Sequence, residues 1–266
     1  MDVYLERKSA KLNGLGRELI RIPSVDIPGP GLSKKHIGEF WIEKYSVTFE
    51  DYSVFVRRTG YAPPTINLTS TRDRADEKLL WNSDLTFDDN LAKKPVVFVS
   101  WYDALAYAEW CGMTLPTVAE WSVAAFGWPP KRFPWGNSRW SRIRSNNASM
   151  RDAWLDRDLT DVDSYPRGRS PYGCMDMWGN TVEWCLNTLE DMFDSETRFD
   201  LNHIQRFHNE PIGGRRCGEP SDRIVAGNPR NRNGCSCEHF GIQPATRKSN
   251  FIGSRCLWKP RVRGNG

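Results

Sequence analysis

Two thiols near the C-terminus are the residues best suited to redox chemistry. Cys235 and Cys237 lie two positions apart in the stretch GNPRNRNGCSCEHFGIQPATRKSNFIGSRC, residues 227–256. Thiolates are nucleophiles and soft metal ligands, so a close pair could form a reactive thiol site or hold a metal ion. The same stretch is rich in Asn, Arg, Ser and Gly, so a polar binding surface and an ordinary exposed loop are the alternatives.

The polar composition of this stretch favours recognition. Asn, Ser and His on ordered loops give adaptable hydrogen bonds, and Phe adds a rigid aromatic surface, as in antibody paratopes. We therefore interpret the stretch as a surface for a protein or a small-molecule ligand. The residues expected to contact that ligand are Asn231, Asn233, Ser236, Glu238, His239, Phe240, Ile242, Thr246, Lys248 and Ser249.

A second group of residues, in GCMDMWGNTVEW (173–184), suits a hard cation. Asp176 and Glu183 supply carboxylates, and the turn around Gly179 exposes backbone carbonyls. Ca²⁺ prefers about six to eight oxygen ligands of this kind. The alternative is that Asp176 caps the turn and that Glu183 pairs with an arginine.

Length and composition indicate a soluble globular chain. Its 266 residues are enough for one large domain or two small ones. The net charge is only +4, with basic and acidic residues interspersed, so we expect no nucleic-acid partner. No segment resembles a signal peptide or a membrane span, so we expect a cytoplasmic protein. Seven cysteines without a regular framework are expected to be free thiols.

Three helices are predicted by one signal, a Ser or Thr followed three positions later by an acidic residue. The hydroxyl can cap a free backbone N–H while the carboxylate accepts a hydrogen bond in return. The three pairs are Thr48 with Asp51, Ser100 with Asp103, and Thr117 with Glu120. Glycines that follow each helix should end it, namely Gly60, Gly112 and Gly127.

Outside these helices the sequence predicts short, irregular pieces. Aromatic and β-branched residues in 38–48 indicate a strand. After residue 130, Gly, Pro and Asn separate short apolar runs, which is typical of long ordered loops. The 12 tryptophans also suggest an irregular core, in which each indole needs a hydrogen-bond partner at one end.

Four motifs, taken together and in this order, resemble a known family. They are EKYSVTFEDYSVFVRRTGY (43–61), LPTVAEW (115–121), FPWGN (133–137) and SPYGCMDMWGNTVEW (170–184). They closely resemble the formylglycine-generating-enzyme/sulfatase-modifying-factor domain, a variant of the C-type lectin fold. The resemblance implies a loop-rich α+β domain with small twisted sheets, a few helices and bound calcium. We place this domain at residues 36–260, after a lead-in of 1–35 and before a basic tail of 261–266.

The resemblance also implies site residues. The calcium ligands of the family would fall on Asp176, Gly179, Thr181 and Glu183, of which Gly179 and Thr181 would use their carbonyl oxygens. Enzymes of the family use two thiols, five positions apart near the C-terminus, to bind Cu(I) and oxidise a peptide cysteine to formylglycine with dioxygen. Cys235 and Cys237 depart from that spacing. The resemblance and composition make Cys111, Cys174, Cys185 and Cys256 small buried side chains.

A branch of the same family offers a second comparison. Variable proteins of diversity-generating retroelements display a hypervariable C-terminal surface on this fold. Their last segment is similar to NPRNRNGCSCEHFGIQPATRKSNFIGSR, residues 228–255. This similarity and the displaced cysteines favour a ligand-binding module without catalytic residues. The alternative is a copper-dependent formylglycine-generating oxidase that acts through Cys235 and Cys237.

Overall fold

Short strands form three small sheets. The computed structural model describes residues 11–12, 16–28, 34–64, 81–138, 143–146, 159–188, 222–227, 240–249 and 252–260. The first sheet has the order β1-β2-β5-β10, with β1 at Lys11–Leu12, β2 at Arg17–Ile22, β5 at Phe40–Glu43 and β10 at Leu257–Trp258. A two-stranded sheet joins β3 (Val25–Pro28) to β4 (Lys34–Ile37). The last sheet has the order β8-β7-β6-β9, with β8 at Phe240–Pro244, β7 at Asp222–Ala226, β6 at Val182–Thr188 and β9 at Ile252–Gly253.

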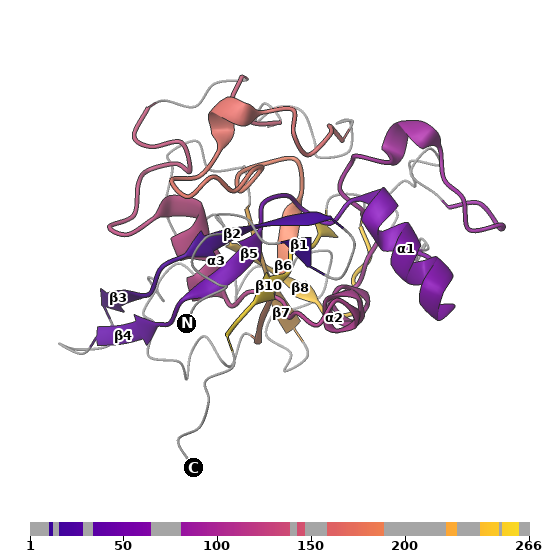
Figure 1. The fold of residues 1–266 in the computed structure, drawn as a ribbon, viewed down its shortest axis with the longest axis horizontal. Helices are drawn as coiled ribbons and strands as arrows, with labels where there is room; N and C mark the ends of the chain where they lie inside the picture. Colours follow the sequence, from indigo (N-terminus) through magenta and orange to yellow (C-terminus); the bar gives the residue numbers. More distant parts are fainter. Residues whose placement is uncertain are drawn as a thin grey trace, which may run out of the picture.

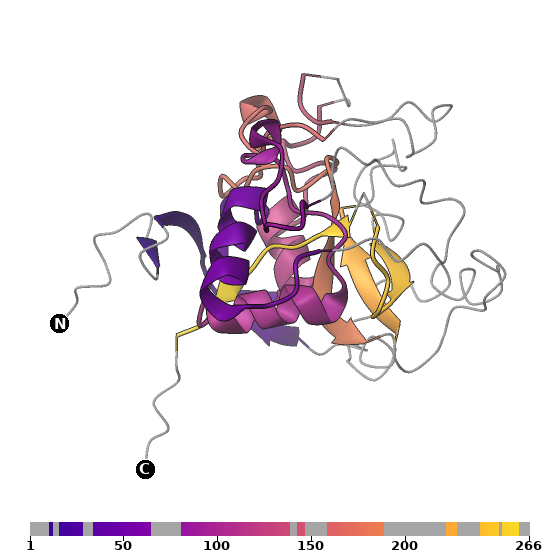
Figure 2. The same ribbon diagram turned by 90° about the vertical axis from the view of Figure 1, so that its right-hand side faces the viewer.

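Helices lie around these sheets. They are α1 (Phe49–Thr59), α2 (Trp101–Trp110), α3 (Val118–Phe126) and the 3₁₀ turns η2 (Asp89–Leu91) and η4 (Pro166–Gly168). Figure 1 shows α1 and α2 on one side of the central strands and α3 on the other. Figure 2 shows β7 and β8, in orange and yellow, on the side of the molecule away from the N-terminal strands. Among the described residues, no helix is long and apolar enough to cross a membrane.

All three predicted helix starts are confirmed. Thr48, Ser100 and Thr117 each accept a hydrogen bond from the backbone of the acid three positions on, and that acid returns one. α1 ends at Gly60, which adopts a left-handed conformation. α3 ends at Gly127, whereas the C-cap of α2 is Cys111, one residue before the predicted stop.

The structured domain begins earlier than the sequence suggested. β2, which the sequence analysis assigned to the lead-in, pairs with β5 and buries Leu19 and Ile22. Arg17 of β2 also forms a buried ion pair with Glu43 of β5. The apolar and polar residues of RELIRI alternate with a period of two, which is the pattern of a strand. The predicted domain start at residue 36 left this strand outside the domain.

Tryptophans hold the two sheets and the helices together. Trp121, Trp178 and Trp184 are almost fully buried. The indole N–H of Trp184 donates to the carbonyl of Val99 at 3.0 Å, and that of Trp101 donates to the carbonyl of Cys185 at 2.9 Å. The expectation that each buried indole finds a partner is confirmed for these two, whose partners tie α2 and its preceding loop to β6, but it is wrong for Trp81, whose buried N–H has no hydrogen-bond partner among the described residues.

Candidate functional site

The C-terminal stretch belongs to a β-hairpin. β7 and β8 are antiparallel, and Ala226 lies opposite Phe240. The chain therefore leaves the sheet at Gly227 and re-enters it at Phe240, at the same end of the two strands. Seven predicted site residues fall between these points and lie outside the described residues: Asn231, Asn233, Cys235, Ser236, Cys237, Glu238 and His239.

The return strand of this hairpin is fixed to the start of α2. The backbone N–H of Trp101 donates to the carbonyl of Ala245 at 2.9 Å. Lys248 forms an ion pair with Asp103 at 3.1 Å. Burial would raise the pKa of Asp103, but hydrogen bonds from Ser100 and the charge of Lys248 lower it overall. Asp103 is thus a charged anchor for this segment.

The remaining predicted ligand residues differ in their surroundings. Thr246 is exposed, Lys248 is half-buried, and Ser249 is fully buried. Ser249 therefore supports the scaffold, and we remove it from the predicted surface. Phe240 and Ile242 lie on β8, an edge strand of its sheet.

Two residues beside the hairpin were missed by the sequence reasoning. Tyr102, at the first turn of α2, is 50% exposed and packs edge-on against Trp101. The guanidinium of Arg223, on β7, lies 4.4 Å from the centre of the Trp101 ring. The feature that makes Tyr102 a candidate contact residue is the exposure of its aromatic ring in the folded chain. Exposure of this kind cannot be inferred from the sequence.

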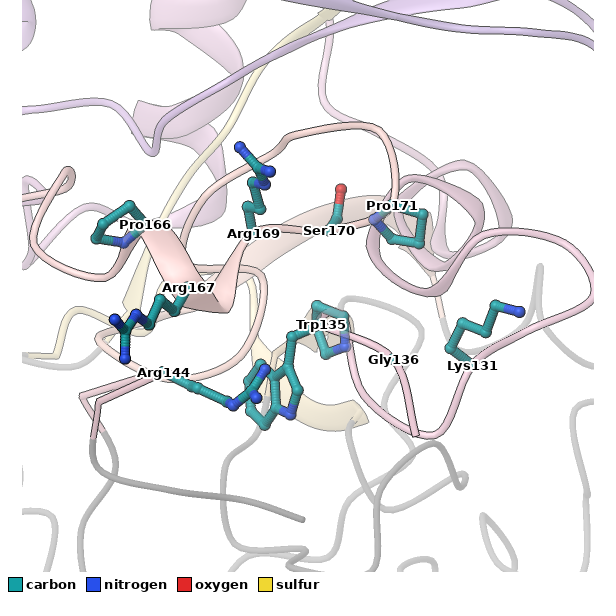
Figure 3. Close-up of a pocket in the computed structure, with 10 residues that line it drawn as sticks. Lys131, Trp135, Gly136, Arg144, Pro166, Arg167, Arg169, Ser170 and Pro171 are labelled. Carbon is teal, nitrogen blue, oxygen red and sulfur yellow. The ribbon is translucent and has the colours of Figure 1, made fainter. Parts of the chain in front are cut away.

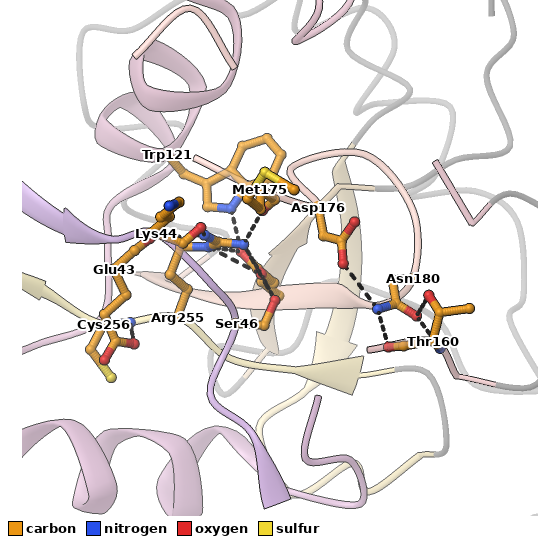
Figure 4. Close-up of polar contacts among 11 residues, drawn as sticks. Glu43, Lys44, Ser46, Trp121, Thr160, Met175, Asp176, Asn180, Arg255 and Cys256 are labelled. Carbon is orange, nitrogen blue, oxygen red and sulfur yellow. Dashed lines mark hydrogen bonds and ion pairs between the residues drawn. The ribbon is translucent and has the colours of Figure 1, made fainter. Parts of the chain in front are cut away.

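A buried ion pair lies between the two larger sheets. Arg255 follows β9, and its guanidinium contacts both carboxylate oxygens of Glu183 at 3.0–3.2 Å. The same carboxylate accepts hydrogen bonds from Ser46 at 2.6 Å and from Trp121 at 2.8 Å. Figure 4 shows Ser46 and Trp121 on either side of Arg255. Both oxygens of Glu183 are therefore occupied by protein donors.

Arg255 also joins loops that are distant in the sequence. Its two terminal nitrogens donate to the carbonyls of Glu43, Lys44 and Met175 at 2.6–2.8 Å. Both Arg255 and Glu183 are almost fully buried, so the pair depends on these extra hydrogen bonds to offset its loss of water. The sequence analysis had allowed that Glu183 pairs with an arginine, and Arg255 is that arginine.

Asp176 lies in a strained turn beside this pair. It has a φ of 53°, in the left-handed region, and Asn180 donates to its Oδ2 at 3.1 Å. Its Oδ1 is buried and has no hydrogen-bond partner. Burial raises the pKa of Asp176 from its ordinary 3.8 to about 7, although the Asn180 hydrogen bond and Arg255 oppose this. Asp176 is thus a buried carboxyl with one unsatisfied oxygen.

A comparison with known families identifies the protein family to which this architecture belongs. A family model described as "Sulfatase-modifying factor enzyme 1-like domain" matches residues 22–260. The chain belongs to this family. Its loop-rich α+β architecture is that of the formylglycine-generating-enzyme type.

Relatives of this sulfatase-modifying-factor chain carry different names. It is 31% identical to the formylglycine-generating enzyme of Thermomonospora curvata over 188 residues, which is 57% of this chain and 60% of that enzyme. It is 36% identical to the serine/threonine-protein kinase pkn1 of Chlamydia pneumoniae over 147 residues, or 55% of this chain. The chain thus spans only 22% of the length of that kinase. Treponema denticola variable protein 1 shares the fold, with a TM-score of 0.59 at 14% identity and coverage of 95% and 99% of the two chains.

The four described cysteines of this sulfatase-modifying-factor chain are unsuited to metal or redox chemistry. Cys111, Cys174, Cys185 and Cys256 are buried thiols that form no disulfide within the described part of the chain, as expected. Burial raises the pKa of all four thiols, to about 11 for Cys111 and Cys174. Because the thiolate is the reactive form, these residues remain inert near neutral pH.

The residues that the family resemblance assigns to calcium fit such an ion only in part. The unsatisfied Oδ1 of Asp176 is available to a cation. Glu183 is not, because Arg255, Ser46 and Trp121 occupy its oxygens and Arg255 would repel a cation. Gly179 and Thr181 lie in the turn between the two acids. Among the described residues, no three His, Cys, Asp or Glu side chains form a metal-binding group.

Calcium binding through Asp176 stays a prediction with a direct test. We expect 1 mM EDTA, about a thousandfold excess over trace metal, to lower the melting temperature, because a cation bound only to the folded state stabilises it by mass action. In Asp176→Ala the melting temperature should not respond to EDTA or to added Ca²⁺. Differential scanning calorimetry of both proteins gives the result. Identical melting temperatures of the wild-type protein in EDTA and in Ca²⁺ would refute the assignment.

Proposed function

We propose that this chain is a recognition module that binds a protein or small-molecule ligand through the loop of its C-terminal hairpin. The observation that carries the proposal is the register of β7 and β8. Because Ala226 lies opposite Phe240, residues 227–239 leave and re-enter the sheet at the same end of β7 and β8. Loops held in this way by a rigid scaffold are where binding residues concentrate.

The flanks of the loop support this role. On one side, Val225 and Ala226 of β7 are buried, and β7 pairs with β6 in the interior of its sheet. At the far end of the return strand, Ala245 and Lys248 anchor the chain to α2. A fixed base lowers the entropy that a recognition loop loses when it binds.

The loop composition and its neighbours supply contact chemistry. The loop sequence GNPRNRNGCSCEH combines amide, guanidinium, hydroxyl and imidazole groups. Exposed Thr246 and Tyr102 lie on the elements that anchor the hairpin. Adaptable polar groups of this kind are part of the composition that antibody paratopes use. A diversified loop of the retroelement type is consistent with this composition and is part of the proposal.

Thiol oxidation is the alternative, and it rests on Cys235 and Cys237 alone. The four described cysteines are buried, and burial raises the pKa of each thiol, so they are unfavourable thiolate ligands near neutral pH. Residues two positions apart on an extended segment point to the same side, so spacing alone does not exclude a thiolate pair. The oxidase alternative therefore requires its own measurement.

Replacing the loop tests the recognition proposal. Residues 228–239 are exchanged for a Gly/Ser segment of equal length, which keeps the hairpin connection. A random peptide library displayed on phage is panned on the wild-type protein, and the dissociation constants of the selected peptides are measured by calorimetry. We expect each selected peptide to lose at least about tenfold in affinity for the loop variant, or about 1.4 kcal/mol.

A matched control separates loss of the surface from loss of the fold. Arg58→Gln changes an exposed residue of α1, on another element, and should bind the selected peptides like the wild type. The loop variant should keep the wild-type circular dichroism spectrum. Equal binding of the peptides to a folded loop variant would show that recognition does not use residues 228–239.

A further inference from the structure

A second site lies in loops far from the hairpin in the sequence. Ten residues from 131–136, 144 and 166–171 line an open hollow of about 520 Å³. Its described lining contains four basic side chains and no acidic one; the basic residues are Lys131, Arg144, Arg167 and Arg169. Figure 3 shows Arg144 reaching toward Trp135, with Arg167 on the side from which Arg144 comes and Lys131 on the opposite side.

An aromatic stack orients one of these arginines. Trp135 lies face to face with Phe133, which is buried, at 4.9 Å and an interplanar angle of 6°. Phe133 and Gly136 exchange two backbone hydrogen bonds, of 3.0 and 2.9 Å, so the turn between them is tight. The guanidinium of Arg144 lies 5.9 Å from the centre of the Trp135 ring. Stacking on an indole restricts a guanidinium while leaving its N–H groups free to donate.

Gly168 brings the loop that carries Arg167 against the loop that carries Arg144. Gly168, the residue after Arg167, approaches the backbone of Arg144 so closely that a Cβ there would lie 1.7 Å from the Arg144 carbonyl oxygen. Gly168 also donates to the carbonyl of Tyr165 at 2.8 Å, which closes η4. The loops that bear Arg144 and Arg167 are therefore locked together, and the two cations are held near each other.

Arg144 is half-buried and Arg167 is exposed, and their surroundings differ from those of the cations that pair within the fold. Arg17, Lys248 and Arg255 each pair with a carboxylate of the described chain. For Arg144 and Arg167, by contrast, no carboxylate among the described residues lies within ion-pair distance. Like charges held close together repel, and an anionic ligand would relieve that repulsion.

We propose that this pocket binds a compact ligand that carries several phosphate groups. Arginine presents a planar fork of donors that matches phosphate oxygens two at a time. A cavity of this volume falls in the range of small-ligand sites, which is about 300–1,000 Å³, and exceeds the needs of a single phosphate. The four basic side chains line a single hollow, which suits a compact polyanion.

Calorimetry with tripolyphosphate tests the site. We expect saturable binding at 150 mM NaCl by the wild-type protein, with affinity lowered at least tenfold in Arg144→Gln and in Arg167→Gln. Arg58→Gln removes the same charge from the exposed surface of α1 and should bind like the wild type. ATP serves as a second probe. Tighter binding of ATP than of tripolyphosphate would identify a nucleotide as the source of the phosphates, whereas equal binding would identify a free polyphosphate.

Three results would overturn the proposal. One is the absence of binding of both probes at millimolar concentration. Another is equal weakening in Arg58→Gln and Arg144→Gln, which would indicate general charge attraction that salt screens. The last is unchanged tripolyphosphate binding by folded Trp135→Leu and Arg167→Gln variants. The proposed site requires the oriented guanidinium groups, so both variants should bind more weakly even when their fold is intact.

Discussion

Arg255→Met should lower the free energy of unfolding by about 3–5 kcal/mol, because removal of one partner of a buried ion pair leaves the other charge unpaired. Glu183 would keep its charge without the guanidinium that contacts both of its oxygens. The carbonyls of Glu43, Lys44 and Met175 would lose their donor as well. Urea denaturation followed by tryptophan fluorescence measures this loss.

Two further variants separate the ion pair from general effects of losing an arginine. Arg21→Met removes a half-exposed arginine that pairs with Glu39 at the surface, and it should cost less than about 1 kcal/mol. Arg255→Met combined with Glu183→Gln removes both charges and keeps one acceptor oxygen, which either Ser46 or Trp121 can use. This double variant should be at least about 1 kcal/mol more stable than the sum of the two single changes predicts. Simple additivity, or a single variant as stable as Arg21→Met, would contradict the role given to Arg255.

Asp176 should make the stability of the metal-free protein depend on pH between about 4 and 7. Its pKa is raised from 3.8 to about 7 by burial, so the folded protein holds this proton more tightly than the unfolded chain does. The contribution of the group to the free energy of unfolding is therefore fully present below pH 4. It falls as the pH rises toward 7, by up to about 1.4 kcal/mol per pH unit.

Asp176→Asn removes this titration and keeps the shape of the side chain. Asn also tolerates the left-handed conformation at this position. With EDTA present, the variant should gain stability relative to the wild type as the pH rises from 4 to 7, and the difference should then stay constant. Parallel curves of unfolding free energy against pH would show that Asp176 titrates in the folded protein as it does in the unfolded chain.

Local signals in the sequence predicted the helices well. Each Ser/Thr–acid pair needs only four residues and one hydrogen-bond pattern, so Thr48, Ser100 and Thr117 could be identified without the rest of the fold. The family motifs extended this to the architecture, because they occur in a fixed order along most of the chain.

The polar sites needed the tertiary structure. Glu183 and Arg255 are 72 positions apart, and no local pattern pairs them. Arg144 and Arg167 are brought together by a glycine whose surroundings cannot be inferred from the sequence. Ser249 was assigned to the surface by composition alone, although the fold buries it. The sequence analysis thus named Glu183, but it identified neither its partner Arg255 nor the two arginines of the pocket.

The measurement that tests recognition against catalysis most directly is a peptide oxidation assay. The purified protein is incubated with Cu(I), dioxygen and a peptide of the Cys-x-Pro-x-Arg type, and the peptide is then examined by mass spectrometry, with Cys235→Ser and Cys237→Ser run alongside. A recognition module should leave the peptide cysteine unchanged, and both variants should keep the wild-type fold and affinity for the selected peptides. Conversion of the cysteine to formylglycine by the wild type, lost in either variant, would contradict the proposed function and make Cys235 and Cys237 a catalytic pair.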